Sequence, residues 1–235
     1  MPTSLAISHD QVSAVAPAVI GRSALQKKAD FHTGLERVLS TSGSVLHFMQ
    51  DCQIYGEGEP AETFFKIVSG AVRTCKFLSD GRRQIDAFQI EGDIFGLEAG
   101  EEHRLSAEAL SDCTVISYRR RVVERLAASD DVLSRQLFSY AMHNMTRAQD
   151  HALLLGRRSA VEKVVAFLLE WADRSPCTGT IALAMTRQDI ADYLGLTIET
   201  VSRTLSQLER DSMIELSAVR QIRFTNPAAL RALTS

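Results

Sequence analysis

The stretch from Met185 to Leu208 constrains the fold most, because two helical patterns flank a single glycine there. Thr186 is placed to cap a first helix, with its hydroxyl accepting from the backbone N–H near Asp189. Gly195 can adopt the positive φ with which many helices end, and Thr197 is placed to cap a second helix. Caps and glycine at this spacing predict a helix-turn-helix of the kind that reads DNA. The alternative is an ordinary solvated helical hairpin.

The predicted second helix has two contrasting faces. Val201, Leu205 and Leu208 repeat at helical spacing, so we expect them to pack against a core. The other side carries the groups that a major-groove helix uses: an arginine fork for guanine, a glutamate acceptor for cytosine and a serine for base or phosphate. These candidate base-reading residues are Glu199, Ser202 and Arg203, with Gln207 beside them. Because helix starts attract phosphates, the candidate phosphate contacts are Thr186, Arg187 and Thr197.

Length and composition indicate a protein with ordinary hydrophobic cores. The 235 residues suffice for two domains, and 45% hydrophobic with 23% charged residues is typical of globular proteins. The net charge of −3 is unusual for a DNA-binding protein, but residues 157–235 carry ten Lys and Arg against nine Asp and Glu, which leaves room for a local basic face. No run of about 18 apolar residues occurs, and the short apolar stretch Val12–Ile20 is a poor signal peptide, because Pro17 interrupts it and His9 and Asp10 precede it in place of a basic region. We therefore expect a cytoplasmic protein without membrane contact.

The four cysteines, Cys52, Cys75, Cys113 and Cys177, are widely separated and form no CxxC pair. A zinc or iron–sulfur site built from neighbouring ligands is therefore not expected, and we predict neither a metal nor another cofactor. Reduced thiols are the ordinary state in the cytosol. Cys177 lies in a predicted loop with proline and glycine, which makes it the candidate redox-active thiol. The chain has no HExxH, P-loop or GxSxG pattern, so we expect no catalytic residues and no enzymatic activity.

Residues 1–24 show no sustained period and are expected to be a flexible tail. Residues 25–128 form the predicted sensory domain, in which glycines recur at spacings of 12, 11 and 11, at Gly58, Gly70, Gly81 and Gly92. Short strands between evenly spaced turns indicate an all-β barrel or sandwich, and Asp80-Gly81 is typical of a hairpin turn. Arg82 and Arg83 after this turn, and Arg119–Arg121 at a later strand end, are interpreted as solvated charges, although the hairpin tip could also contact a protein partner.

Residues 130–155 contain neither proline nor glycine and predict a long helix that ends at Gly156. Apolar and small side chains alternate by three and four, which makes a heptad seam of Phe138, Ala141, Met145, Ala148, Ala152 and Leu155. We expect Leu133, Leu137 and Tyr140 to broaden this seam. Such a seam packs either on its own domain or on an identical helix, and its small residues favour a parallel homodimer. Residues 129–156 are therefore the predicted dimerisation helix.

Residues 157–235 form the predicted DNA-binding domain. A helix is expected over Arg157–Asp173 and a short strand over Ile181–Met185, before the helix-turn-helix. After it, Met213–Leu216 and Gln221–Phe224 predict a wing-like hairpin, and Asn226-Pro227 is typical of a helix start. The predicted fold class is α+β, with an N-terminal β-roll, a long dimerisation helix and a C-terminal winged helix-turn-helix.

This order of elements resembles the CRP/FNR superfamily of bacterial transcription factors, whose β-roll is a jelly roll of the cyclic-nucleotide-binding type. The resemblance covers the chain from about residue 30 to the C-terminus. Its most specific part is Tyr193–Arg203, which is similar to the recognition motif of the FNR and FixK branches. In that family the E-x-x-S-R side chains read TTG/CAA half-sites, which implies this role for Glu199, Ser202 and Arg203. Ile198 holds the family position for apolar contact, so it is expected to meet a thymine methyl group.

Four further stretches are most similar to FixK-type regulators: Tyr55–Glu59, Ser79–Gln84, Phe95–Gly100 and Asp150–Arg157. That resemblance implies an activator of genes for low-oxygen life, such as nitrogen fixation, denitrification or high-affinity respiration, whose activity is set largely by its own abundance. It also implies double-stranded DNA and RNA polymerase as partners. Whether the protein activates or represses depends on where its site lies relative to polymerase.

Two departures from the family pattern bear on how the protein is controlled. FNR-type oxygen sensors hold an iron–sulfur cluster on cysteines near the N-terminus, whereas the first cysteine here is Cys52. Relatives that bind cyclic AMP use an FGE-L cassette followed by R-S or R-T. Here Phe95–Ala99 places Glu98 one position late, which in a strand would face it the other way, while Arg104 and Ser106 remain. The open alternatives are a cyclic-nucleotide-responsive regulator and a regulator controlled by oxidation of a thiol.

Overall fold

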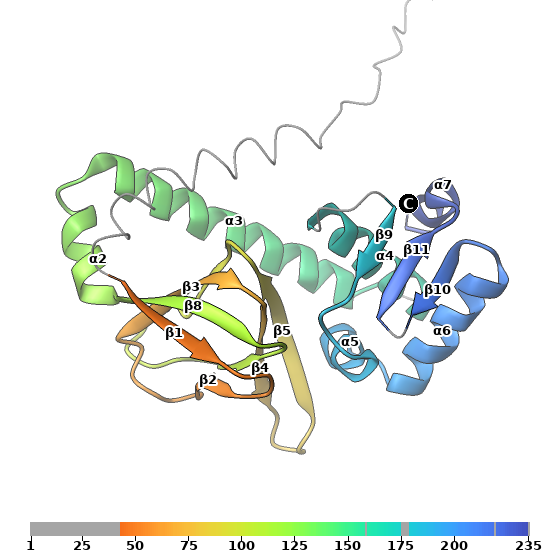
Figure 1. Cartoon of the computed structure of the whole chain (residues 1–235), viewed down its shortest axis with the longest axis horizontal. Helices are drawn as coiled ribbons and strands as arrows, with labels where there is room; N and C mark the ends of the chain where they lie inside the picture. Colours follow the sequence, from red (N-terminus) through yellow and green to blue (C-terminus); the bar gives the residue numbers. More distant parts are fainter. Residues whose placement is uncertain (1–42, 158, 175–178, 219, 235) are drawn as a thin grey trace, which may run out of the picture.

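The computed structural model describes residues 43–157, 159–174, 179–218 and 220–234, which form two parts joined by a long helix (Figure 1). The predicted tail over residues 1–24 and Cys177 lie outside the described residues. The N-terminal part contains β1 Ser44–Phe48, β2 Gln53–Tyr55, β3 Thr63–Ser69, β4 Ala71–Phe77, β5 Arg83–Ile90, β6 Ile94–Phe95, β7 Ser106–Ala109, β8 Cys113–Arg119 and α2 Arg120–Ala127. After α3 (Asp131–Leu155), the C-terminal part contains α4 Ala160–Arg174, β9 Thr180–Ala182, α5 Arg187–Leu194, α6 Ile198–Arg210, β10 Ile214–Ala218, β11 Gln221–Phe224 and α7 Pro227–Ala232. Among the described helices, none is long and apolar enough to cross a membrane.

The N-terminal strands form two antiparallel four-stranded sheets, in the orders β1-β8-β3-β6 and β2-β7-β4-β5. Inward-facing side chains of both sheets make the core between them, including Phe65, Ile67, Val72, Phe95 and Val115. The predicted all-β domain is therefore confirmed. The four glycines at the predicted turns all have positive φ, between 81° and 89°. In the hairpin between β4 and β5, the Asp80 carboxylate accepts from the backbone N–H of Arg82 at 3.0 Å, as the Asp-Gly pattern indicated.

The arginine run after β8 is more ordered than a solvated strand end. Arg119 closes β8 and is exposed, as predicted. Arg120 instead begins α2, where its Nε donates to Glu124 one turn later at 2.7 Å. The helix forms here because Val123 on its inner face is buried with side chains of the β-roll. The interpretation of Arg120 as a solvated strand end is therefore wrong.

The long helix α3 runs along the β-roll and reaches the C-terminal part (Figure 1). Asp130 caps its start, since the carboxylate accepts from two backbone N–H groups of the first turn. Leu133 is buried in a cluster with β-roll side chains, and Leu137 and Tyr140 pack against the same cluster. The expectation that these three residues broaden the dimer seam is therefore wrong. Spacings of three and four residues occur on both faces of a helix, so this period does not distinguish the face toward the β-roll from the seam.

The C-terminal part is a winged helix-turn-helix, as predicted. Its small antiparallel sheet has the order β10-β11-β9, and the wing pairs Ile214 with Phe224. The Asn226 side chain accepts from the backbone N–H of Ala229 at 3.0 Å and begins α7. The predicted strand over residues 181–185 is shorter than expected, because β9 ends at Ala182.

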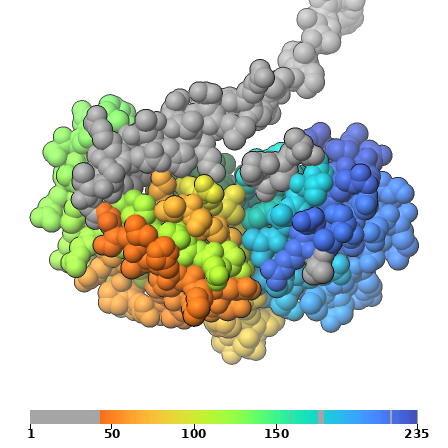
Figure 2. All heavy atoms as spheres, in the orientation of Figure 1, coloured from red at the N-terminus to blue at the C-terminus, as the bar shows by residue number. Residues whose placement is uncertain are grey.

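One hydrophobic cluster continues from the β-roll into the C-terminal part. Phe88 of β5 is 2% exposed, and its ring centroid lies 5.1, 6.1 and 6.2 Å from those of Tyr193, Phe167 and Trp171. Figure 2 shows the two parts packed directly against each other. Aromatic rings buried in this way contribute both buried apolar area and edge contacts, so Phe88 stabilises the packing of the two parts against each other.

Arg83 belongs to the same interface rather than to solvent. Its guanidinium donates to the carboxylates of Asp189 and Asp192 in α5, at 2.6 and 2.8 Å. Arg174 of α4 likewise donates to Asp93 of the β-roll at 2.7 Å. The interpretation of Arg83 as a solvated charge is therefore wrong. Its partners lie 106 and 109 residues away, where no local pattern could indicate them.

Replacing Phe88 with alanine is expected to lower the free energy of unfolding by about 3–5 kcal/mol, because it opens a cavity between the two parts. Phe77 on the neighbouring strand β4 is 58% exposed, so Phe77→Ala is the matched control, with an expected change within about 0.5 kcal/mol. Urea unfolding at one fixed protein concentration, followed by circular dichroism and by the fluorescence of Trp171, measures both. Equal losses in the two variants would contradict the coupling of the parts through Phe88.

Candidate nucleic-acid interface

The helix-turn-helix has the local geometry that the sequence predicts. The Thr186 hydroxyl accepts from the backbone N–H of Asp189 at 3.1 Å, and the Asp189 carboxylate accepts from the backbone N–H of Thr186 at 2.9 Å. This reciprocal capping box fixes the start of α5. Gly195 ends α5 in the left-handed conformation, with φ of 63°, and Thr197 caps α6 by accepting from Thr200. The short turn between the helices is therefore specified at both ends.

The second helix, α6, buries one face and exposes the other. Val201, Leu205 and Leu208 are buried, as predicted, and Thr204 is buried beside them. On the opposite side Glu199, Arg203 and Gln207 are exposed, Ser202 is half-buried and Ile198 is 37% exposed. The first two turns of α6 thus bring all the candidate base-reading side chains to one accessible stretch.

Glu199 is held in its ionised form at the start of this helix. Its own backbone N–H, then the Thr197 hydroxyl and the charge of Arg203 lower the pKa of its carboxyl group. An ionised carboxylate only accepts hydrogen bonds, which suits the exocyclic amine of cytosine. The guanidinium of Arg203 donates to the backbone carbonyl of Glu199 at 3.4 Å, and its charge acts on the Glu199 carboxyl group, so the acidic and basic groups lie near each other on the exposed face.

The candidate phosphate contacts lie at the two helix starts. Thr186, Arg187 and Thr197 are exposed, and both threonine hydroxyls also cap their helices. Arg187 therefore supplies the charge, while the backbone N–H groups of the helix starts supply donors. Sequence reasoning missed Arg220 in the wing, whose guanidinium donates to the carbonyl of Ala184 at 3.2 Å, close to the start of α5.

Most of the predicted dimer seam on α3 is exposed, as far as the described residues show. Phe138 is 69% and Met145 46% exposed, and Ala141, Ala148 and Ala152 are exposed between and beyond them. Leu155, the last member, is half-buried, with its Cδ2 near Gly195 of the helix-turn-helix. An apolar stripe of this length at the surface of a helix is a feature that ordinarily marks an interface.

A cavity of about 260 Å³ lies between the β-roll, α3 and the C-terminal part. Glu98 lines it, because this residue follows the two-residue strand β6 in an irregular segment. Strand alternation does not apply there, so the expectation that Glu98 faces the other way is wrong. Arg104, which the cyclic-nucleotide cassette would need for the phosphate, is exposed and does not line the cavity.

The charges around this cavity oppose an anionic ligand. Carboxylates of Asp86, Glu98 and Glu170 line it. Arg147, which also lines it, already donates to the side chain of Gln89 and the carbonyl of Phe88. Three carboxylates thus outnumber the one guanidinium group in the lining, and this balance of charge disfavours a phosphate.

The described cysteines differ in accessibility. Cys75 and Cys113 are buried and Cys52 is half-buried. Burial raises the pKa of Cys75 to about 11 and also raises that of Cys113, so these two thiols are poor nucleophiles at neutral pH. The role predicted for Cys177 stays a prediction, since this residue lies outside the described ranges. Those ranges contain no group of three His, Cys, Asp or Glu residues that could hold a metal ion.

Comparisons with known proteins agree with this arrangement. A family model for the Crp-like helix-turn-helix domain matches residues 162–233, and one for the cyclic nucleotide-binding domain matches residues 45–130. The nitrogen fixation regulation protein FixK of Azorhizobium caulinodans is 46% identical over 204 residues, covering 85% of this chain and 82% of that protein. FixK of Rhizobium meliloti is 42% identical, covering 77% and 82%. The solved structure of FixK2 from Bradyrhizobium japonicum has a TM-score of 0.79 at 47% identity, covering 82% of this chain and 98% of that one.

Cyclic AMP is expected to leave the affinity of the protein for DNA unchanged, because three carboxylates outnumber the one guanidinium group in the lining of the cavity. Fluorescence anisotropy of a labelled duplex, titrated with protein in the presence and absence of saturating cyclic AMP, measures this. Ionic strength is kept constant, since affinity for DNA falls with salt, and AMP at the same concentration is the control. A rise in affinity with cyclic AMP alone would contradict the interpretation of the cavity.

Proposed function

Because the chain belongs to the FixK branch of the CRP/FNR superfamily of DNA-binding transcription regulators, we propose that it binds, as a homodimer, a DNA palindrome with TTG and CAA half-sites. The observation that carries this proposal is the exposed start of α6, where Ile198, Glu199, Ser202 and Arg203 stand together. Their donors and acceptors match base edges in the major groove rather than phosphates alone.

Each of these four side chains has a distinct part in the proposed recognition. The guanidinium of Arg203 donates two hydrogen bonds to guanine O6 and N7, and Glu199 accepts from cytosine N4. Ser202 contacts either a base or a phosphate, and Ile198 packs on a thymine methyl group. Thr186, Arg187 and Thr197 hold the flanking phosphates and so fix the register of α6 in the groove.

The proposed dimer forms through the exposed stripe of α3, with Phe138, Ala141, Met145, Ala148, Ala152 and Leu155 packed on the same residues of a second chain. A two-fold axis along this stripe relates the α6 helix of one chain to that of the other. The two α6 helices, which we refer to as the reading helices, then enter successive major grooves. Half-sites about 34 Å apart, one turn of DNA, are expected from such an arrangement. Residues 129–156 then act as the dimerisation helix between a β-roll at residues 25–128 and a DNA-binding domain at residues 157–235.

The regulated genes are inferred from the relatives, whose names refer to nitrogen fixation regulation. We propose that the protein activates genes for low-oxygen metabolism, nitrogen fixation or respiration by contacting RNA polymerase at promoters with this palindrome. It acts in the cytoplasm, where bacterial DNA lies, as a regulator and not as an enzyme. Genome-wide mapping of bound sites tests the palindrome and the gene set together.

Replacing Arg203 with alanine is expected to cost about 1–3 kcal/mol of binding to the TTG palindrome and to relax the preference at the guanine. Arg210 lies at the other end of α6 and is exposed, so Arg210→Ala removes the same charge from the same helix. This control is expected to weaken binding to all sequences slightly and equally. Anisotropy titrations with the palindrome and with a duplex altered at the guanine measure both effects. Unchanged discrimination in Arg203→Ala would exclude the proposed role of this residue.

Replacing Met145 with aspartate is expected to raise the dissociation constant of the dimer at least about a hundredfold, since two unpaired carboxylates would be buried in the interface. Thr146, the next residue, is exposed on another face of α3, and Thr146→Asp is expected to leave the dimer intact. Sedimentation equilibrium measures the association, and binding to a full palindrome against a half-site measures its consequence. Dimers of equal strength in both variants would place the interface elsewhere.

A further inference from the structure

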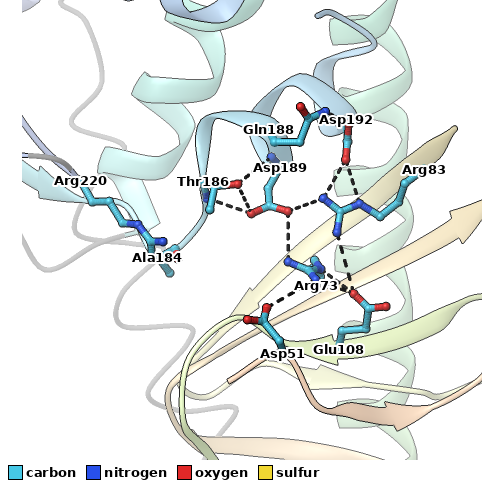
Figure 3. Close-up of polar contacts among 10 residues, drawn as sticks. All are labelled: Asp51, Arg73, Arg83, Glu108, Ala184, Thr186, Gln188, Asp189, Asp192 and Arg220. Carbon is cyan, nitrogen blue, oxygen red and sulfur yellow. Dashed lines mark hydrogen bonds and ion pairs between the residues drawn. The ribbon is translucent and has the colours of Figure 1, made fainter. Parts of the chain in front are cut away.

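An ionic cluster joins the β-roll to the first helix of the helix-turn-helix (Figure 3). Asp189 of α5 accepts from Arg73 of β4 at 3.1 Å and from Arg83 of β5 at 2.6 Å. Arg83 also pairs with Asp192 of α5, whose carboxylate lies 2.7 Å from the guanidinium Nη2. Glu108 of β7 lies beside both arginines, at 2.7 Å from Arg73 and 3.9 Å from Arg83. We refer to these five residues as the arginine clamp.

The centre of the clamp is buried and its other four side chains are only 12–18% exposed, which distinguishes it from surface ion pairs of little energetic value. Asp189 is 1% exposed. Burial alone would raise the pKa of its carboxyl group, but hydrogen bonds from Thr186 and the charges of Arg73 and Arg83 outweigh it and leave the pKa lowered. The carboxylate is therefore ionised, and its removal from water is compensated by these donors. Losing an arginine would leave a buried charge without its partner, which is strongly unfavourable.

The geometry of the clamp restrains the orientation of α5. Asp189 and Asp192 are three residues apart, so they lie on the same face of the helix, and the planar guanidinium of Arg83 bridges them. The clamp occupies this face of α5. Arg187 at the start of α5 stays exposed, as do the candidate base-reading residues Ile198, Glu199 and Arg203 of α6. The contact therefore holds the helix-turn-helix without covering the groups that would meet DNA.

From these contacts we infer that Arg83, supported by Arg73, is a positioning residue for DNA binding, which fixes the helix-turn-helix against the β-roll in the orientation that two half-sites require. The inference rests on the proposed function. A reading helix that rotates freely is in the competent orientation only part of the time, and its apparent affinity falls by that fraction. Arg83 thus acts through Asp189 and Asp192 and does not itself contact DNA.

The test compares Arg83→Gln with Arg82→Gln in the full-length dimer. Arg82 is the adjacent residue, loses the same charge, and pairs with Asp80 in its own hairpin. Arg83→Gln is expected to lower affinity for the TTG palindrome about tenfold or more, and Arg82→Gln to leave it unchanged. Arg83→Lys keeps a charge but not the planar bridge, so it is expected to retain more affinity than Arg83→Gln.

Two further measurements separate positioning from a loss of charge or of folding. Trp171, the single tryptophan, contacts Phe88 across the interface, so its emission reports the packing of the two parts without DNA. Arg83→Gln is expected to shift that emission to longer wavelength while circular dichroism shows a folded chain. In an Asp192→Asn background the effect of Arg83→Gln on affinity is expected to shrink at least about threefold, because the pair is already broken.

Equal affinity and equal Trp171 emission in Arg83→Gln and Arg82→Gln would overturn the inference. A loss of affinity without a change in emission and without coupling to Asp192 would also overturn it, since Arg83 would then act through its charge alone. Failure of the unmodified protein to prefer the TTG palindrome over a scrambled duplex would instead refute the proposed function. The emission measurement uses no DNA, so it still tests the clamp in that case.

Discussion

The buried carboxylate of Asp189 connects the start of the helix-turn-helix to the β-roll. One oxygen accepts from the backbone N–H and the hydroxyl of Thr186, at 2.9 and 2.7 Å. The other accepts from Arg73 and Arg83, at 3.1 and 2.6 Å. A buried carboxylate is tolerated only when its acceptor sites are satisfied. The capping of α5 and the arrangement of the two parts therefore depend on the same ionised group. Loss of either arginine would change the charge environment of the carboxylate that caps α5.

The helix α3 extends this dependence to the surface proposed for dimerisation. Leu133 and Tyr140 anchor one face of the helix on the β-roll, and the Tyr140 hydroxyl donates to the carbonyl of Ile94. The exposed stripe that includes Phe138 and Met145 lies on a different face. Because one rigid helix carries both faces, a partner chain seated on the stripe would have a defined position relative to the β-roll. Phe88 and the arginine clamp then transmit that position to the reading helix.

Features specified by neighbouring residues could be predicted from the sequence, whereas those made by distant residues could not. Thr186, Gly195 and Asn226 carry their own capping or turn chemistry, so the helix boundaries near them are confirmed. Arg83 finds its partners 106 and 109 residues away, and nothing in the hairpin around it indicates them. The expectation for Glu98 is wrong because the alternation rule presumes a strand, and β6 ends at Phe95. The roles of the exposed side chains on α6 stay predictions, because recognition depends on a DNA partner.

The arginine clamp also bears on how a chain with a net charge of −3 can approach DNA. Asp189 and Asp192 lie on the short helix α5, which begins at Arg187. The start of this helix is the proposed phosphate contact. Charges closer together than the Debye length of about 8–10 Å are only partly screened, so unpaired carboxylates there would repel phosphates. Arg73 and Arg83 pair with these two carboxylates from the side of the β-roll, and they share their charge with Glu108, so the clamp as a whole has two guanidinium groups against three carboxylates. The β-roll thereby contributes to the electrostatic field at the reading motif as well as to its orientation, which net charge or the composition of residues 157–235 alone does not reveal.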